Sequence, residues 1–356
     1  MAILYGKKMS KHEIMQRVGE MSQIAGARLS RLQFGKADGV PAIDFKTGAG
    51  LNFTVLPGRG MDISWADYKG KAIGFISKTG IVDACYYEND YDGFHRTFFA
   101  GLLTTCGLRN IGKNCIDGDE PLGLHGRISN TPAYDISISN EWENDEYIMQ
   151  ATGKVCESKL YGENLLLTRK ISARMGENKI SIYDTIENCG FKPEPLTLLY
   201  HCNLGFPLLD EESELILPIE NTIPRDMTAE HVLKNYNRFE SPQDEYPETV
   251  FYHTLKQNDT GHTYAALFNH KLGNNGLGLA IKYNKENLPY LIQWKNMGKG
   301  DYVVALEPAN CYPEGRDAIR RRGNLTMINP GEIKYYSLEF VVLEGQDDLL
   351  NIKQLL

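Results

Sequence analysis

The chain has 356 residues, 42% of them hydrophobic and 24% charged, which is enough for two average domains or one large β domain. Its formal net charge of −8 argues against nucleic acid as a partner, because such binding depends on Lys and Arg neutralising phosphates. Seven cysteines, an odd number with no C-x-x-C pair, indicate reduced thiols in a cytoplasmic protein rather than a disulfide framework.

No apolar stretch reaches the roughly 18 residues that a membrane span requires, so we expect no membrane association. The N-terminal residues have neither the apolar core nor the small-residue cleavage pattern of a signal peptide. These features agree with a cytoplasmic location. The sequence leaves the oligomeric state open.

The first predicted element is a helix over residues 10–20. Ser10 and Glu13 have the spacing of a capping box, and Ile14, Val18 and Met21 follow at helical spacing. We therefore expect residues 1–26 to form an N-terminal helical extension.

From residue 27 onward the pattern changes to short apolar runs separated by Gly, Pro, Asn and Asp. Alternating apolar and polar residues predict strands with one buried face, as in antiparallel sheets. The predicted strands include 42–45, 52–56, 136–139, 180–183, 196–200, 264–268, 277–283, 288–294, 302–306 and 335–343. No linker interrupts them, so we expect an all-β sandwich or barrel in one domain, residues 27–356. The acidic stretch 240–248 is predicted to be a surface loop.

Three segments place an ionisable side chain beside Gly, Pro or Asn, next to a predicted strand. His125 lies between glycines, His201 follows the run 196–200, and Glu307 follows the run 302–306 and precedes Pro308. Two imidazoles and a carboxylate could serve as proton donor and acceptor. The structural alternatives are a turn histidine, a core histidine, and an ion pair of Glu307 with Arg59 or Arg316.

The order of these segments resembles that of the aldose 1-epimerases (mutarotases), and more closely a mutarotase-like branch without an assigned activity. The resemblance spans roughly residues 30 to 343. It rests on Leu124-His125-Gly126-Arg127, on Tyr200-His201-Cys202-Asn203-Leu204-Gly205, on Leu291-Ile292-Gln293-Trp294 followed by Ala305-Leu306-Glu307-Pro308, and on Asn329-Pro330-Gly331-Glu332. The chain departs from the family at Leu198-Leu199-Tyr200, where the family has an Asn/Thr-rich approach to its second histidine.

The resemblance implies a galactose-mutarotase-like supersandwich of two large antiparallel sheets, with one short N-terminal helix and a sugar cleft. It also implies a sugar epimerase that interconverts α and β anomers at C1 by ring opening. In that mechanism Glu307 is the general base, His201 the general acid and His125 a second polar group at the sugar. No metal, nucleotide or other cofactor is implied.

Further residues are candidates for contacts with the sugar. Arg59 and Asp62 lie on a glycine-rich turn, Asn203 follows the second histidine, and Trp294 could stack on a pyranose. Arg59, Arg127 and Arg316 would suit a sugar with an acidic substituent if they converge. The family's substrate-binding aspartate has two candidate counterparts, Asp226 and Asp244.

Other functions remain open on the same scaffold. They are another carbohydrate isomerase, a lyase, a glycoside-processing enzyme with Asp62 as its second carboxylate, or a non-catalytic sugar-binding protein. A nucleophilic Cys106 is disfavoured by its apolar neighbours. A metal site built from His95, His125, His201 and Glu307 lacks the close spacing of typical histidine ligands.

Overall fold

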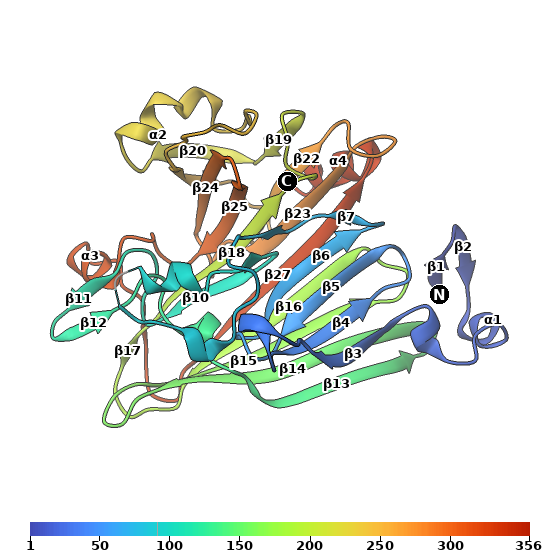
Figure 1. Ribbon diagram of the computed structural model, residues 1–356, viewed down its shortest axis with the longest axis horizontal. Helices are drawn as coiled ribbons and strands as arrows, with labels where there is room; N and C mark the ends of the chain where they lie inside the picture. The colour runs from blue at the N-terminus through green and yellow to red at the C-terminus, as the bar shows by residue number, and fades with distance from the viewer. Residues whose placement is uncertain (91) are drawn as a thin grey trace.

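Antiparallel β-sheets make up most of the protein in the computed structural model, which describes residues 1–90 and 92–356. Figure 1 shows the blue strands of one sheet in front of the green strands of another. Along the strands Glu146–Ser158, Asn164–Arg174 and Ile333–Glu344 buried residues alternate with more exposed ones, so one face of each of these strands packs into the core. The expected all-β supersandwich is confirmed.

Within the described residues, three large sheets carry the fold. The eight-stranded sheet has the order β13 (Tyr134–Glu143), β14 (Glu146–Ser158), β15 (Asn164–Arg174), β16 (Lys179–Asn188), β27 (Ile333–Glu344), β23 (Leu277–Asn284), β22 (His262–Asn269) and β19 (Ser213–Ile216). The six-stranded sheet has the order β10 (Thr104–Leu108), β18 (Thr197–Gly205), β25 (Asp301–Ala309), β24 (Tyr290–Gly298), β21 (Thr249–Leu255) and β20 (Ile219–Pro224). The five-stranded sheet has the order β3 (Gly26–Arg31), β4 (Pro41–Lys46), β5 (Leu51–Leu56), β6 (Asp62–Tyr68) and β7 (Lys71–Ala72).

Smaller elements connect these sheets. Four strand pairs are β1 (Ala2–Leu4) with β2 (Lys7–Met9), β8 (Phe75–Ile76) with β9 (Ala100–Gly101), β11 (Cys115–Asp117) with β12 (Glu120–Leu122), and β17 (Glu194–Pro195) with β26 (Met327–Ile328). The helices are α1 (Lys11–Met15), α2 (Met227–His231), α3 (Arg316–Arg321) and α4 (Gln346–Lys353). Short 3₁₀ turns cover Met21–Gln23, Gly35–Ala37, Ala84–Tyr86, Gly93–Arg96, Ile128–Asn130 and Leu233–Asn235. Among the described residues, every helix is too short or too polar to cross a bilayer.

One continuous apolar cluster joins the three large sheets. It includes Phe45 and Phe53 of the five-stranded sheet, Ile182 of the eight-stranded sheet, and Tyr200 and Leu306 of the six-stranded sheet. The rings of Phe45 and Phe53 stack with centroids 4.5 Å apart. Burial of this kind is the main favourable term in folding, so the sheets stabilise one another.

A second apolar cluster lies on the other face of the six-stranded sheet. It includes Leu199 of β18, Ile292 of β24 and Val250 of β21. Because successive side chains of a strand point to opposite faces, Leu199 and its neighbour Tyr200 belong to different clusters. Both faces of this sheet are therefore covered, and all nine residues of β18 are buried.

The predicted strands correspond to real strands, but several are longer than the sequence suggested. The run 196–200 belongs to β18, which continues to Gly205, and the run 302–306 belongs to β25, which continues to Ala309. The prediction that His201 and Glu307 follow the ends of their strands is therefore wrong. Both lie within strands. The Asn and Gly residues after His201 and the Pro after Glu307 are common in turns, but here they continue β18 and β25.

The N-terminal residues form a capped helix and an unpredicted hairpin. The Glu13 N–H donates to Ser10 Oγ and the Ser10 N–H donates to the Glu13 carboxylate, which confirms the capping box. The helix ends at Met15 rather than near residue 20, since Val18 and Gly19 are weak helix formers. The strands of the preceding β1–β2 hairpin are too short to be predicted from alternating apolar and polar residues. The division of the chain into 1–26 and 27–356 stays a prediction.

Candidate active site

The candidate site lies on one face of the six-stranded sheet. His201 is on β18 and Glu307 is on the neighbouring strand β25. The antiparallel register pairs Cys202 with Leu306, so His201 stands opposite Glu307. Both side chains point away from the central core, because Tyr200 next to His201 and Leu306 next to Glu307 face that core.

The two ionisable groups are in close contact and almost completely buried. His201 Nε2 and Glu307 Oε1 are 3.2 Å apart, and the residues are 5% and 2% exposed. Burial lowers the pKa of His201 to about 3. Burial also raises the pKa of Glu307 well above its usual value, and the nearby carboxylate of Glu248 raises it further. Burial of the pair therefore favours its uncharged form, with the proton on Glu307.

His125 reaches the pair from a tight turn. Its ring centroid is 5.7 Å from that of His201, and its φ of 58° is left-handed. A Cβ on the next residue, Gly126, would lie 2.2 Å from the carbonyl oxygen of Gly107, so only glycine fits. The Gly112 N–H donates to His125 Nδ1 over 3.3 Å, which leaves the proton of the neutral ring on Nε2. Burial lowers the pKa of His125 well below its usual value, so it can act as a neutral donor.

The pair and His125 line a pocket of about 250 Å³. The apolar part of its wall comes from two loops and two strands, through Phe94, Phe98, Leu124, Val250, Ile292 and Trp294. The ring centroids of Trp294 and His201 are 5.6 Å apart, so the indole lies beside the acid–base pair. An indole face suits the C–H face of a sugar ring, as the sequence analysis expected for Trp294.

Arg225 and Glu248 also line the pocket and were missed by the sequence analysis. Arg225 donates to Glu248 Oε1 over 3.0 Å, and Trp294 Nε1 donates to Glu248 Oε2 over 2.8 Å. The two residues lie at the two ends of the segment that connects β20 to β21. No short spacing in the sequence indicates that residues 225 and 248 meet, and Glu248 ended a stretch predicted to be surface loop.

The two aspartates considered from the sequence have other roles. Asp226 accepts the Ala229 N–H as the N-cap of α2 and also accepts Arg225 Nε. Asp244 pairs with Lys299 at the surface. Neither lines the pocket, where Glu248 is the second carboxylate.

Arg59 and Asp62 lie outside the pocket, contrary to expectation. Arg59 is 1% exposed, and its guanidinium donates to three backbone carbonyl groups, among them that of Ser129 at 2.8 Å. Asp62 is fully buried and accepts hydrogen bonds from Thr105 and Arg169. Neither group is available to a sugar, and Asp62 cannot be the second carboxylate of a glycosidase.

The other residues predicted to contact the sugar are Arg316, Arg127 and Asn203, and none of them lines the pocket. Arg316 is 2% exposed and donates to the carboxylates of Asp117 and Glu120. Arg127 is exposed and does not line the pocket. The buried Asn203 donates from Nδ2 to the His201 carbonyl over 2.9 Å. Arg59, Arg127 and Arg316 therefore do not converge, and Arg225 is the arginine of the pocket.

The thiol of Cys106 does not line the pocket. Cys106 is fully buried, and burial raises its pKa well above the usual value, so it stays a thiol. Among the described residues, no three His, Cys, Asp or Glu side chains are grouped so as to hold a metal ion.

Comparisons with other proteins place the chain by sequence and by fold. A family model described as "Domain of unknown function (DUF4432)" matches residues 37–342. No curated protein sequence matches the chain.

Several solved structures share the fold. A protein of Klebsiella pneumoniae, provisionally identified as an aldose 1-epimerase, is 24% identical with a TM-score of 0.87, over 92% of this chain and 86% of that one. A galactose mutarotase-like protein of Clostridium acetobutylicum is 14% identical with a TM-score of 0.60, over 90% and 99% of the two chains. The galactose 1-epimerase of Lactobacillus acidophilus is 14% identical with a TM-score of 0.58, again over 90% and 99%. The chain therefore has the galactose mutarotase-like fold.

Proposed function

The chain belongs to the DUF4432 family, and we propose that it is a cofactor-independent sugar epimerase that interconverts α and β anomers at C1. The observation that carries the proposal is the 3.2 Å contact between His201 Nε2 and Glu307 Oε1 in the wall of a pocket. The shared fold of the epimerases described above supports the same conclusion.

The chemistry requires two proton transfers in each direction. In ring opening Glu307 takes the proton of the C1 hydroxyl, and His201 gives a proton to the ring oxygen. The C1–C2 bond then rotates, and the ring closes on the other face with the two roles reversed. The pair begins and ends with one proton, so the reaction consumes no other reactant.

The proton must be on His201 when the ring begins to open. Burial by itself instead favours the proton on Glu307. The positive charge of Arg225 lowers the pKa of Glu307, and hydroxyl groups of a bound sugar can donate to the carboxylate. Both effects favour the ionised pair in the complex. The neutral Nε2–H of His125 supplies a further donor at the sugar.

We expect Glu307→Gln and His201→Asn each to slow anomer interconversion by about 10² or more, since each removes one positioned proton transfer. Polarimetry or exchange NMR on fresh α-sugars measures the rate, and circular dichroism checks the fold. Glu286→Gln, at an exposed position, is the matched control. Wild-type rates in either site variant would refute the assignment, and sugar binding without catalysis by the wild type would indicate a binding protein.

We also propose a cytoplasmic location. All seven cysteines are described, and the structure pairs none of them in a disulfide. Unpaired thiols persist in a reducing compartment.

A further inference from the structure

We propose that the substrate is an aldose with an anionic group, a carboxylate or a phosphate, at the end of the sugar opposite C1. Arg225 and Lys113 would hold this group. The inference rests on the proposed function, because it names the substrate class of the same pocket.

Arg225 lies across the pocket from the acid–base pair. Its N–H donates to the Val250 carbonyl over 2.9 Å, so it extends the edge strand β20 beside β21. Three strand spacings separate β20 from β25, which carries Glu307, or roughly 14 Å between backbones. Its long side chain turns back toward the pocket, where it meets Glu248. A sugar with C1 at Glu307 would therefore present its other end to Arg225.

The guanidinium of Arg225 pairs with two carboxylates but keeps one nitrogen free. Nε donates to Asp226 Oδ2 over 2.8 Å and Nη2 donates to Glu248 Oε1. Nη1 has no partner among residues 1–90 and 92–356. Glu248 also accepts Trp294 Nε1, so both of its oxygens are already engaged. The free edge of the guanidinium can bind an anionic oxygen, and such a charge-assisted hydrogen bond is stronger than a neutral one.

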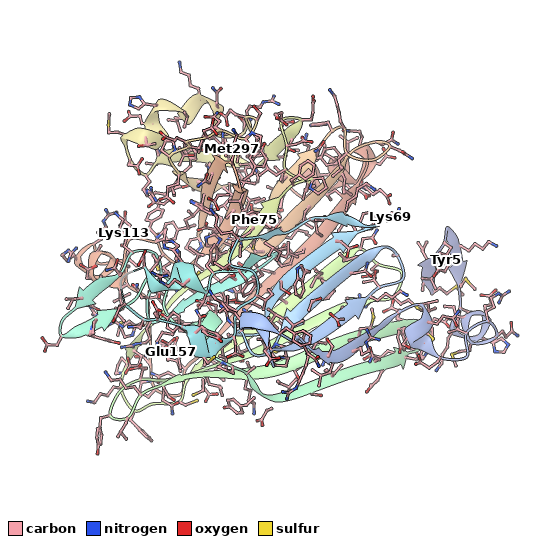
Figure 2. The ribbon with its side chains drawn as sticks, viewed as in Figure 1. Tyr5, Lys69, Phe75, Lys113, Glu157 and Met297 are labelled. Carbon is pink, nitrogen blue, oxygen red and sulfur yellow. The ribbon has the colours of Figure 1, made fainter. Side chains whose placement is uncertain are left out.

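Lys113 adds a cation at the rim, where His95 also lies. Both are exposed and line the pocket. In the described part of the chain, no carboxylate lies within ion-pairing distance of either residue. Figure 2 labels Lys113 on the side of the molecule that carries α3, opposite the N-terminal hairpin with Tyr5. Asp226 and Glu248 both pair with Arg225, so the exposed Lys113 is the cation of the lining that has no pairing carboxylate among the described residues.

Apart from its ionisable groups, the lining offers few hydrogen-bonding partners to a neutral sugar. Phe94, Phe98, Leu124, Val250 and Ile292 are apolar, and no Ser, Thr, Asn or Gln lines the pocket among the described residues. Sugar hydroxyl groups that face these apolar side chains would lose hydrogen bonds to water without replacement. Charged contacts at Arg225 and Lys113 would then distinguish one sugar from another.

The test compares acidic aldoses with their neutral parents. Rates of anomer interconversion are measured by exchange NMR for D-glucuronate, D-glucose 6-phosphate and D-glucose, and for D-galacturonate and D-galactose. We expect kcat/KM of the wild type to be about tenfold or more higher for an acidic sugar than for its parent, as for hydrogen bonds to charged groups. The uronates and the phosphate show which anion the pocket takes.

Variants of the two partners of the Arg225–Glu248 ion pair should change the preference for acidic sugars in opposite directions. Arg225→Gln and Lys113→Gln should each lower the ratio of kcat/KM for the acidic sugar to that for its parent. Glu248→Gln should raise this ratio, because it removes a competing carboxylate. A purely structural role would not give opposite signs. Lys299→Gln, an exposed lysine that does not line the pocket, is the control.

Preference for neutral sugars, or a ratio unchanged in both cation variants, would overturn the inference while leaving the epimerase proposal intact. If the wild type interconverts none of the sugars, the epimerase proposal fails, and calorimetry then decides the inference separately. Binding of D-glucuronate or D-glucose 6-phosphate that weakens in Arg225→Gln supports it. Binding of neither compound, or binding that Arg225→Gln leaves unchanged, overturns it.

Discussion

His201 and Glu307 have pKa shifts of opposite sign with one physical cause. Loss of water disfavours the charged form of each, which lowers the pKa of an imidazole and raises that of a carboxyl. Because the two groups touch, they are best treated as one unit that holds a single proton over a wide pH range. That property suits a reaction in which a proton moves into and out of the pair.

We therefore expect kcat/KM to stay level as the pH falls from 7 to 5. The pair takes up a second proton only near the pKa of His201, about 3, and loses its first only as the pH rises through the raised pKa of Glu307. Activity should decline on that alkaline side. A pH–rate profile of the wild type measures this. An acid limb near 6.5, the ordinary value for histidine, would show that His201 is hydrated and the pair is not a unit.

At the scale of elements, single side chains tie strands of different sheets together. Glu157 of β14 in the eight-stranded sheet accepts the Leu108 N–H of β10 in the six-stranded sheet over 2.9 Å. The residue is 5% exposed, and burial raises its pKa to about 7. The bond holds β10 close to β14, and β10 is paired with β18, which carries His201.

Glu157→Gln should change how stability depends on pH. A raised pKa means that this group's stabilisation is complete below 4.5, the unfolded value, and is lost as the pH rises through about 7. Glutamine cannot ionise and still accepts the Leu108 N–H. From pH 5 to pH 8 the variant should gain on the order of 2–3 kcal/mol in unfolding free energy relative to the wild type.

Urea unfolding at the two pH values measures the difference, and Glu141→Gln on β13, at an exposed position, is the control. If the unfolding free energy changed equally with pH in Glu157→Gln and in the wild type, the raised pKa of Glu157 would be contradicted. If Glu141→Gln gained as much unfolding free energy as Glu157→Gln, the cause would be a general effect of charge.

At the scale of the molecule, a buried ionic network connects the three large sheets. Arg169 of the eight-stranded sheet binds Asp62 of the five-stranded sheet at 2.9 Å and Asp184 of its own sheet at 2.6 Å. Tyr200 of the six-stranded sheet donates to Asp184 over 2.7 Å, and Thr105 of the same sheet donates to Asp62. A buried network of this kind must remain complete, because a charge that loses its partner stays without water.

Asp62→Asn should lower the unfolding free energy by about 3 kcal/mol, because Arg169 then loses one of its two carboxylate partners. Asp62 does not line the pocket, so KM for the sugar should be unchanged. Urea unfolding and steady-state kinetics measure the two effects. Asp135→Asn, which breaks an exposed pair with Lys154, is the control and should change stability by at most about 1 kcal/mol. A higher KM together with wild-type stability would show that Asp62 contacts the sugar.

Local patterns predicted the β class, the capping box and the positions of most strands. They also singled out His125, His201, Glu307 and Trp294, which all line one pocket. Alternation and turn residues involve neighbours in the chain, so one sequence is enough to detect them. Arg59 and Arg316 were misassigned because the sequence does not show whether an arginine reaches a cleft or is held by buried carbonyls and carboxylates.

Cross-strand register, burial and the folding back of long connections depend on contacts between distant residues. Register placed His201 opposite Glu307, and burial gave their pKa shifts. The folding back of the β20–β21 connection brought Arg225 to Glu248. Spacing along the chain carries no record of such contacts, because they form only when the sheets pack and exclude water. The composition of the pocket, on which the proposed substrate class rests, therefore could not be predicted from the sequence alone.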